Sequence, residues 1–174
     1  MKIDVKELKK KVGNEATYLF EEVMEPVSIT GDEAVFPDPL QVKAHLVNTG
    51  EGLLARVRVD GEALLHCSRC LEIFTFPLHV EFETQYREEG QGSPGKAEAE
   101  GLNLEYYHGD TVDLEDEVRE NLFLAIPMKP VCREACPGLC PRCGRNRSLD
   151  GECGCENMEI DPRMASLKDL KLEE

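Results

Sequence analysis

Apolar and polar residues alternate through the middle of the chain. The longest alternating stretch runs from Phe74 to Phe82, where every second residue is apolar. This period of two is typical of a β-strand with one buried face. Residues 42–46 and 55–59 repeat the pattern over shorter lengths. We therefore predict a small antiparallel β domain centred on about residues 39–85.

Turn signals refine this prediction. Asp60-Gly61 lies between two alternating stretches and indicates a hairpin turn. Pro77 lies inside the longest stretch, which favours a sheet edge or a bulge there because proline cannot donate to a neighbouring strand. The first 25 residues suggest a short strand and a helical turn, and residues 102–107 suggest one more strand.

The pattern changes after residue 86. Residues 87–101 hold no large apolar side chain and predict a flexible insertion. A long acidic helix is expected next, with Asp113 as its N-cap, carboxylates in its first turn and Pro127 at its end. Its apolar stripe consists of Leu114, Val118, Leu122, Ala125 and Ile126.

These elements predict an α+β protein with two parts. Residues 1–127 would form the small antiparallel β domain with its acidic helix. Residues 128–174 would form a cysteine-rich zinc module followed by a C-terminal helix, since Asp161-Pro162 is a typical helix start.

Eight cysteines carry the strongest chemical signal. A C-x-x-C turn lets two thiolates reach one ion, and Zn²⁺ prefers four such ligands in a tetrahedron. Eight cysteines therefore predict two structural zinc sites. The candidate ligands are Cys67, Cys70, Cys132, Cys136, Cys140, Cys143, Cys153 and Cys155.

The last four of these cysteines form the better-defined set, because a glycine follows the CPRC turn and nine residues allow the chain to double back. By elimination, the first four would form the other site and tie the β domain to the C-terminal module. Other pairings stay open, including Cys67 and Cys70 with Cys140 and Cys143. His66 is a further alternative ligand beside Cys67.

A site closed by four thiolates has no open position for substrate, so the cysteines argue against catalysis. The sequence also lacks a phosphate-binding glycine loop, G-x-S-x-G and H-E-x-x-H, and no small-molecule substrate is evident. Its start has no apolar core of a secretory signal, and no apolar run approaches the length of a membrane span. A cytoplasmic protein keeps its thiols reduced, which favours metal over disulfides.

The formal net charge of −15 rules out nucleic-acid binding by the whole surface. A local exception lies at the CPRC turn, where Arg142, Arg145 and Arg147 gather within six residues. They suit phosphate contact, but equally they would screen a negative zinc–thiolate core.

Several motifs together resemble the YceD family, the large ribosomal RNA subunit accumulation proteins. They are CSRCLEIF, VDLEDEVRENLFLAIPMKPVC, CPGLCPRCG and IDPRMASLKDL, in that order. The resemblance implies a bacterial cytoplasmic protein, related to plant organellar proteins, whose loss reduces mature large-subunit rRNA. It also implies no enzymatic activity, and it carries the cysteines over as metal ligands.

Three functions follow as hypotheses. In the first, a ribosome biogenesis factor binds large-subunit rRNA or a pre-50S particle through the basic turn. In the second, the acidic surface escorts a basic ribosomal protein. In the third, the cysteines serve thiol redox chemistry or zinc sensing, although a redox C-x-x-C normally opens a helix.

Overall fold

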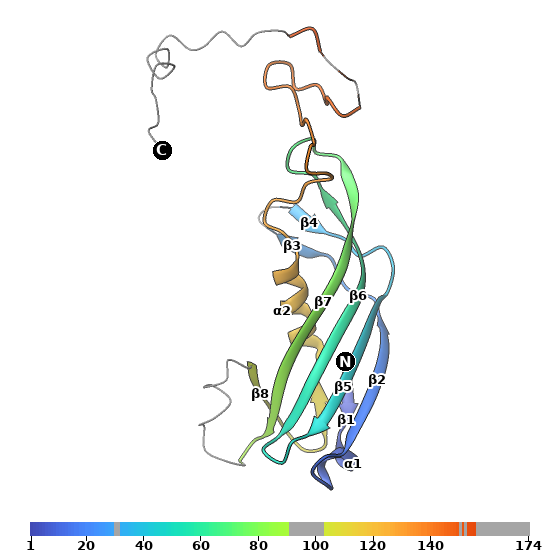
Figure 1. The fold of residues 1–174 in the computed structure, drawn as a ribbon, viewed down its shortest axis with the longest axis vertical. Helices are drawn as coiled ribbons and strands as arrows, with labels where there is room; N and C mark the ends of the chain where they lie inside the picture. Colours follow the sequence, from blue (N-terminus) through green and yellow to red (C-terminus); the bar gives the residue numbers. More distant parts are fainter. Residues whose placement is uncertain (30–31, 91–102, 150, 152, 156–174) are drawn as a thin grey trace, which may run out of the picture.

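A long twisted sheet forms the body of the protein in the computed structural model, which describes residues 1–29, 32–90, 103–149, 151 and 153–155 (Figure 1). Neighbouring strands are antiparallel except for β7 and β8, which are parallel. In spatial order the strands are β2 (Glu15–Glu22), β5 (Leu40–Asn48), β6 (Leu53–His66), β7 (Ile73–Glu88) and β8 (Asn103–Tyr107).

Smaller elements complete the fold. Strands β1 (Lys2–Asp4) and β9 (Thr111–Asp113) form one two-stranded sheet, and β3 (Val27–Ile29) and β4 (Asp32–Ala34) form another. Helix α1 (Lys6–Lys9) is a single turn, whereas α2 (Glu115–Ala125) lies against the long sheet beside β7 (Figure 1). The fold is therefore mostly β, with one substantial helix among the described residues.

The sheet buries one face under α2. Alternate residues of β5, β6 and β7 point inward, as their patterns predict, and pack with the stripe of α2. Val118 and Leu122 of α2 are fully buried. Burying such side chains contributes about 1.5–3 kcal/mol each. The main inward residues of the strands are Val42, Ala44, Leu46, Ala55, Val57, Val59, Leu78 and Val80.

The predicted turn at Asp60-Gly61 is wrong, because β6 continues through both residues. Gly61 is needed for close packing instead: a Cβ there would lie 2.3 Å from Cδ2 of the buried Leu40. The chain turns earlier, where Thr49 N donates to Gly52 O (2.9 Å). Pro77 does lie at an edge, since β8 pairs only with residues 84–88 of β7.

The helix also differs from its prediction. It has 11 residues, an average length, so the expected long helix does not form. Its first turn is acidic as expected, but Leu114 occupies the N-cap position and Ala125 is exposed. Asp113 still contributes, because its Oδ1 accepts a hydrogen bond from Glu115 N (3.1 Å).

Two other predictions concern residues outside those described. The flexible insertion falls largely on residues 91–102, although β7 extends through Arg87 and Glu88. The C-terminal helix falls wholly beyond residue 155. The short strand and helical turn near the N-terminus are confirmed as β1 and α1, and the strand predicted over 102–107 is β8.

One carboxylate of α2 points toward the sheet and gives a pH-dependent stability. Burial, together with Glu105 and Asp116, raises the pKa of Glu117, whose neighbours include the buried Tyr86. A raised folded-state pKa makes the contribution of Glu117 fully present below about pH 4.5 and lost as the pH rises through the folded-state pKa.

We therefore expect Glu117→Gln to flatten the decline of stability above pH 4.5. Urea denaturation at a series of pH values from 4 to 8 measures the free energy of unfolding as a function of pH. Glu120→Gln, on the exposed side of the same helix, should keep the wild-type profile. A profile in Glu117→Gln that still follows the wild type would contradict the assignment.

Candidate metal centres

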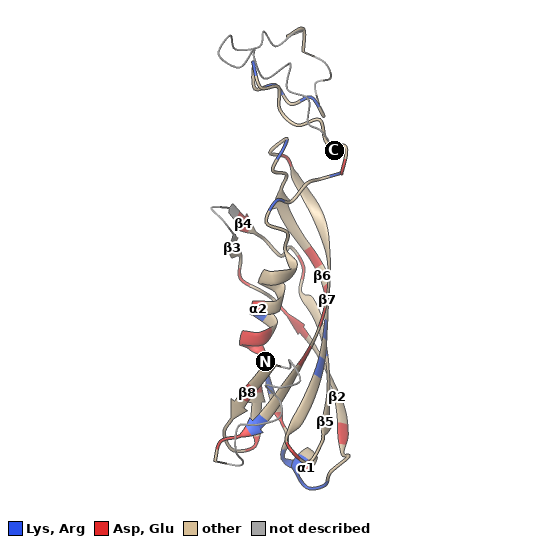
Figure 2. Ribbon diagram, turned by 60° about the vertical axis from the view of Figure 1, so that its left-hand side comes forward, with Lys and Arg blue, Asp and Glu red and all other residues tan. Residues whose placement is uncertain are grey.

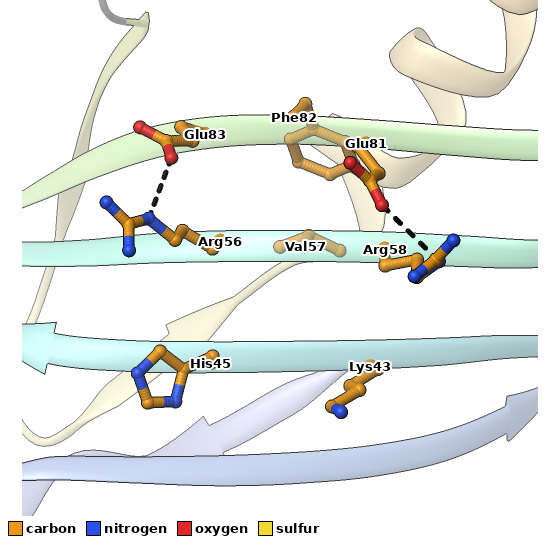
Figure 3. A pocket seen from close by; sticks show the side chains of 8 residues that line it. All are labelled: Lys43, His45, Arg56, Val57, Arg58, Glu81, Phe82 and Glu83. Atoms are coloured by element: carbon orange, nitrogen blue, oxygen red, sulfur yellow. Dashed lines mark hydrogen bonds and ion pairs between the residues drawn. The ribbon is translucent and has the colours of Figure 1, made fainter.

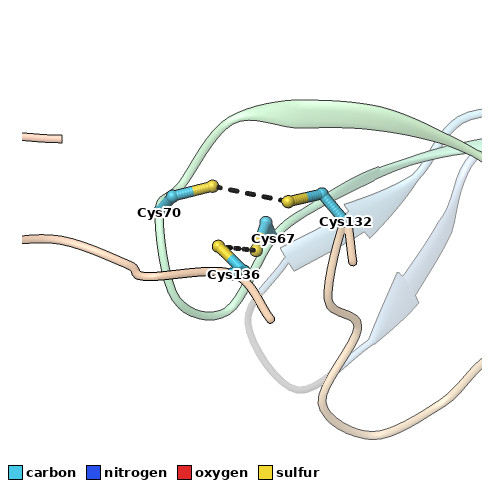
Figure 4. Close-up of side chains that lie close together, drawn as sticks. All are labelled: Cys67, Cys70, Cys132 and Cys136. Carbon is cyan, nitrogen blue, oxygen red and sulfur yellow. Dashed lines mark hydrogen bonds between the residues drawn. The ribbon is translucent and has the colours of Figure 1, made fainter. Parts of the chain in front are cut away.

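The first candidate centre lies at the tip of the hairpin formed by β6 and β7. The connection between these strands holds Cys67 and Cys70, and Cys132 and Cys136 approach it from the segment after α2 (Figure 4). Cys67 Sγ lies 3.8 Å from Cys136 Sγ, and Cys70 Sγ lies 3.9 Å from Cys132 Sγ. Sulfurs from residues more than sixty positions apart therefore converge on one point.

These distances fit a tetrahedral metal ion. Four sulfurs at about 2.3 Å from a zinc ion lie about 3.8 Å from one another, as the two measured pairs do. A disulfide would require about 2.05 Å, and all eight cysteines are free. The donor set and its spacing thus fit the Zn²⁺ that the sequence predicts.

Residues between the two hairpin cysteines hold the other half of the centre in place. Ser68 donates from both N and Oγ to Pro130 O, at 2.8 and 2.9 Å. Arg69 Nη1 donates to Glu134 O (2.8 Å) and Cys136 O (3.2 Å). Arg69, whose sequence context left its role open, therefore positions the segment after α2 that carries Cys132 and Cys136.

The second candidate centre gathers Cys140, Cys143, Cys153 and Cys155, whose sulfurs lie within 4.8 Å of one another. Cys140 is buried, whereas the other three are half-buried or exposed. The two groups of four coincide with the sets that the sequence favoured. Their role as metal ligands stays a prediction.

Both C-x-x-C turns have the same backbone form. Leu71 N donates to Cys67 O (2.9 Å), and Gly144 N donates to Cys140 O (2.8 Å). Both residues have positive φ, +64° for Leu71 and +71° for Gly144. A leucine in this region is strained, and its side chain is 61% exposed. Sequence reasoning missed this feature, although alignment of CSRCL with CPRCG would have revealed it.

The second centre rests directly on the first. Leu139 N donates to Arg69 O (2.9 Å). Asn146 Nδ2 donates to Cys70 O (3.2 Å) and to Glu72 Oε1 (3.0 Å). No sequence signal pointed to Asn146, because its partners are brought to it only by the fold.

Backbone N–H groups favour the thiolate form, and so lower the pKa, at Cys67 and Cys136 of the first centre and at Cys140 of the second. The N–H groups of Cys143 and Arg142 lower the pKa of Cys140 to about 5. Burial would raise the pKa of Cys67, but the N–H groups of Cys132, Cys70 and Arg69 outweigh it and lower the pKa to about 6. A thiolate is the form that binds metal.

The three arginines of the basic turn differ in their surroundings. All three are exposed, but within the described part of the chain only Arg147 contacts a cysteine. Arg147 Nη2 lies 3.7 Å from Cys140 Sγ, so it faces the sulfurs of the second centre. Figure 2 shows basic positions at this end of the molecule and acidic ones on α2.

A second basic group lies on the outer face of the sheet, where side chains of β5, β6 and β7 line a hollow of about 520 Å³ (Figure 3). Arg56 Nε lies 2.7 Å from Glu83 Oε1, and Arg58 Nε lies 3.4 Å from Glu81 Oε1. These cross-strand ion pairs neutralise the arginines, so the hollow is a weak candidate for binding anions.

Comparison with known proteins identifies the family. The model of the family described as "Large ribosomal RNA subunit accumulation protein YceD" matches residues 55–171, about two thirds of the chain. The chain belongs to the YceD family. This match spans the hairpin and both cysteine clusters, and the description of the YceD family names accumulation of an rRNA subunit and no reaction.

Individual relatives agree with this assignment. An uncharacterized protein of Mycobacterium tuberculosis is 31% identical over 143 residues, which is 75% of this chain and 61% of that relative. The Bacillus subtilis protein YlbN is 26% identical over an alignment that covers 76% of this chain and 74% of the length of YlbN. A chloroplastic YCED homolog of Arabidopsis thaliana is named as a large ribosomal RNA subunit accumulation protein. It is 24% identical over an alignment that covers 82% of this chain and 52% of that relative.

The chain thus spans about three fifths of the length of the mycobacterial relatives that it matches. No solved structure is significantly similar to it. Within the part of the chain that the structure describes, no helix is long and apolar enough to cross a membrane.

Proposed function

We propose that each cluster of four cysteines binds one structural Zn²⁺. The spacing of the sulfurs and the backbone N–H groups directed at Cys67 and Cys140 support this proposal. When bound, zinc would supply a closed, redox-inactive link between chain segments. About two zinc ions per chain after purification without chelator would support this role over thiol redox chemistry or zinc sensing. A metal-free form that contains disulfides and stays folded would contradict it.

We further propose that the protein is a non-enzymatic, cytoplasmic factor that supports accumulation of large-subunit rRNA. Membership of the YceD family is the observation that carries this proposal. The contact with rRNA, or with a pre-50S particle, is assigned to the basic turn of the second centre. Arg142 and Arg145 are exposed there, and among the described residues they lie at the other end of the molecule from the acidic first turn of α2.

Arg147 has a different role in this proposal. Its guanidinium lies beside Cys140 Sγ, so it screens the thiolates while the other two arginines contact phosphate. Reversing its charge would place a carboxylate against the cluster. The test of RNA binding therefore leaves Arg147 unchanged.

Arg142→Glu combined with Arg145→Glu is expected to abolish recovery of large-subunit rRNA and to keep the metal content. Tagged protein is isolated from native cytoplasm in RNase-treated and untreated halves, and bound RNA is sequenced. With a defined RNA, the slope of log affinity against log salt should fall by about two, one for each lost phosphate contact.

The matched control combines Lys10→Glu with Arg119→Glu, which makes the same change in charge at one exposed site directly after α1 and one on α2. It should leave rRNA recovery unchanged. Equal loss in both double variants would mean that overall charge, and not the basic turn, governs the association.

The net charge of −15 favours a second candidate function, the escort of a basic ribosomal protein. An acidic surface attracts basic proteins over long range. In the same experiment, a basic ribosomal protein that stays bound after RNase treatment would favour the escort.

A further inference from the structure

Strand β2 is one outer edge of the long sheet, and among the described strands only β5 pairs with it (Figure 1). Asn48 N donates to Asn14 O (2.9 Å). In an antiparallel pair, alternate residues bond to the neighbouring strand and the others face away from it. The register therefore turns outward the N–H and C=O groups of Glu15, Thr17, Leu19 and Glu21.

The edge also exposes apolar surface on both sides of the sheet. Leu19 is 76% exposed on the outer side. On the inner side, Tyr18 and Phe20 are only half-buried although they pack against the core. Strand β2 contains neither the lysine nor the proline that commonly protect an open edge. An added strand would thus gain hydrogen bonds and cover apolar side chains on both faces.

Charge restricts which strand can be added. Between Lys11 and Lys43 the sequence holds seven acidic residues and no lysine, arginine or histidine. Three of the acidic residues, Glu15, Glu21 and Glu22, belong to β2. Opposite charges across neighbouring strands stabilise the pair, whereas like charges destabilise it.

The same charges disfavour two other occupants. A second copy pairing antiparallel through these outward groups, centred on Tyr18, would place Glu15 opposite Glu21 of its partner at both ends. The phosphates of RNA would also meet carboxylates at both ends of the strand. A strand with lysine or arginine among alternating apolar residues meets neither obstacle.

We propose that β2 binds an extended, lysine- and arginine-rich segment of a partner protein as an additional strand of the sheet. This site goes beyond the rRNA contact and lies on a different part of the molecule. Only the identity of the partner in the cell rests on the escort function. Strand addition supplies main-chain hydrogen bonds for affinity, and the acidic residues supply selectivity.

The test uses a ten-residue peptide in which valine and isoleucine alternate with lysine and arginine, titrated at low salt. Hydrogen exchange should slow at the amides of Thr17, Leu19 and Glu21, which face outward. Leu19→Pro removes an outward N–H without removing a bond to β5. It should weaken binding about tenfold or more. Leu19→Thr keeps the N–H and should weaken binding less than about threefold.

Other outcomes overturn the proposal. One is unchanged affinity in Leu19→Pro, and another is equal binding of a control peptide with glutamate in place of lysine and arginine. Protection of β2 by an RNA oligonucleotide would assign the edge to RNA, and a dimer that Leu19→Pro dissociates would assign it to a second copy. Arg142→Glu with Arg145→Glu should still bind the peptide, so failure at β2 and failure of the rRNA contact are distinguishable.

Discussion

Cys70→Ser is expected to remove one zinc ion per chain and to lower the free energy of unfolding by at least about 3 kcal/mol. Cys70 is buried at the tip of the β6–β7 hairpin, where its sulfur faces Cys132. Without a fourth ligand the centre cannot hold its ion firmly, and the segment after α2 loses its main attachment to the sheet. Metal analysis and urea denaturation measure the two effects.

Cys143→Ser is the matched comparison. It should also remove one zinc ion, but its centre links only residues 140–155. We expect the unfolding of the sheet to change by less than about 1 kcal/mol in this variant. Equal destabilisation by both substitutions would mean that the two centres unfold as one unit with the sheet. Retention of two ions in either variant would contradict the ligand assignment.

Gly138→Ala is expected to have the second largest effect, because it disturbs the contact between the two centres. Gly138 has a φ of +70°, and a Cβ there would lie 2.9 Å from Arg69 O. The same oxygen accepts the hydrogen bond from Leu139 N. Backbone strain together with this backbone clash should cost about 2–3 kcal/mol.

Gly144→Ala separates the two causes. Gly144 has nearly the same φ, +71°, but a Cβ there would meet no atom within 4 Å. We expect Gly144→Ala to lower the free energy of unfolding by about 1 kcal/mol, from backbone strain alone. Zinc transfer to a coloured chelator should also be faster in Gly138→Ala than in Gly144→Ala. Equal rates would mean that the docking of the second centre on Arg69 does not stabilise its ion.

Local patterns in the sequence predicted much of this fold. The strict alternation from Phe74 to Phe82 places β7 correctly, and the acidic turn before Val118 places α2 within two residues. Such signals are local because they depend on which face of one element is buried. The grouping of cysteines followed from their number and spacing.

The errors arose where a distant residue decides the outcome. Asp60-Gly61 has the composition of a turn, but the side chain of Leu40 occupies the space beside Gly61 and the strand continues. Asn146 acquires its partners, Cys70 and Glu72, only when two segments seventy positions apart meet. The residues that make such contacts are too far apart in the sequence for any local pattern to include both of them.

The long sequence separation within the first centre has a consequence for synthesis of the protein. Cys67 and Cys70 leave the ribosome more than sixty residues before Cys132 and Cys136, and α2 also follows the strands that it covers. The sheet can pair as soon as β7 emerges, but its inner face stays open to water in the meantime. Contacts between residues so far apart in the sequence form late, and until they form the exposed apolar surface leaves the nascent chain prone to aggregation. Metal uptake at the hairpin tip would then mark the end of cotranslational folding.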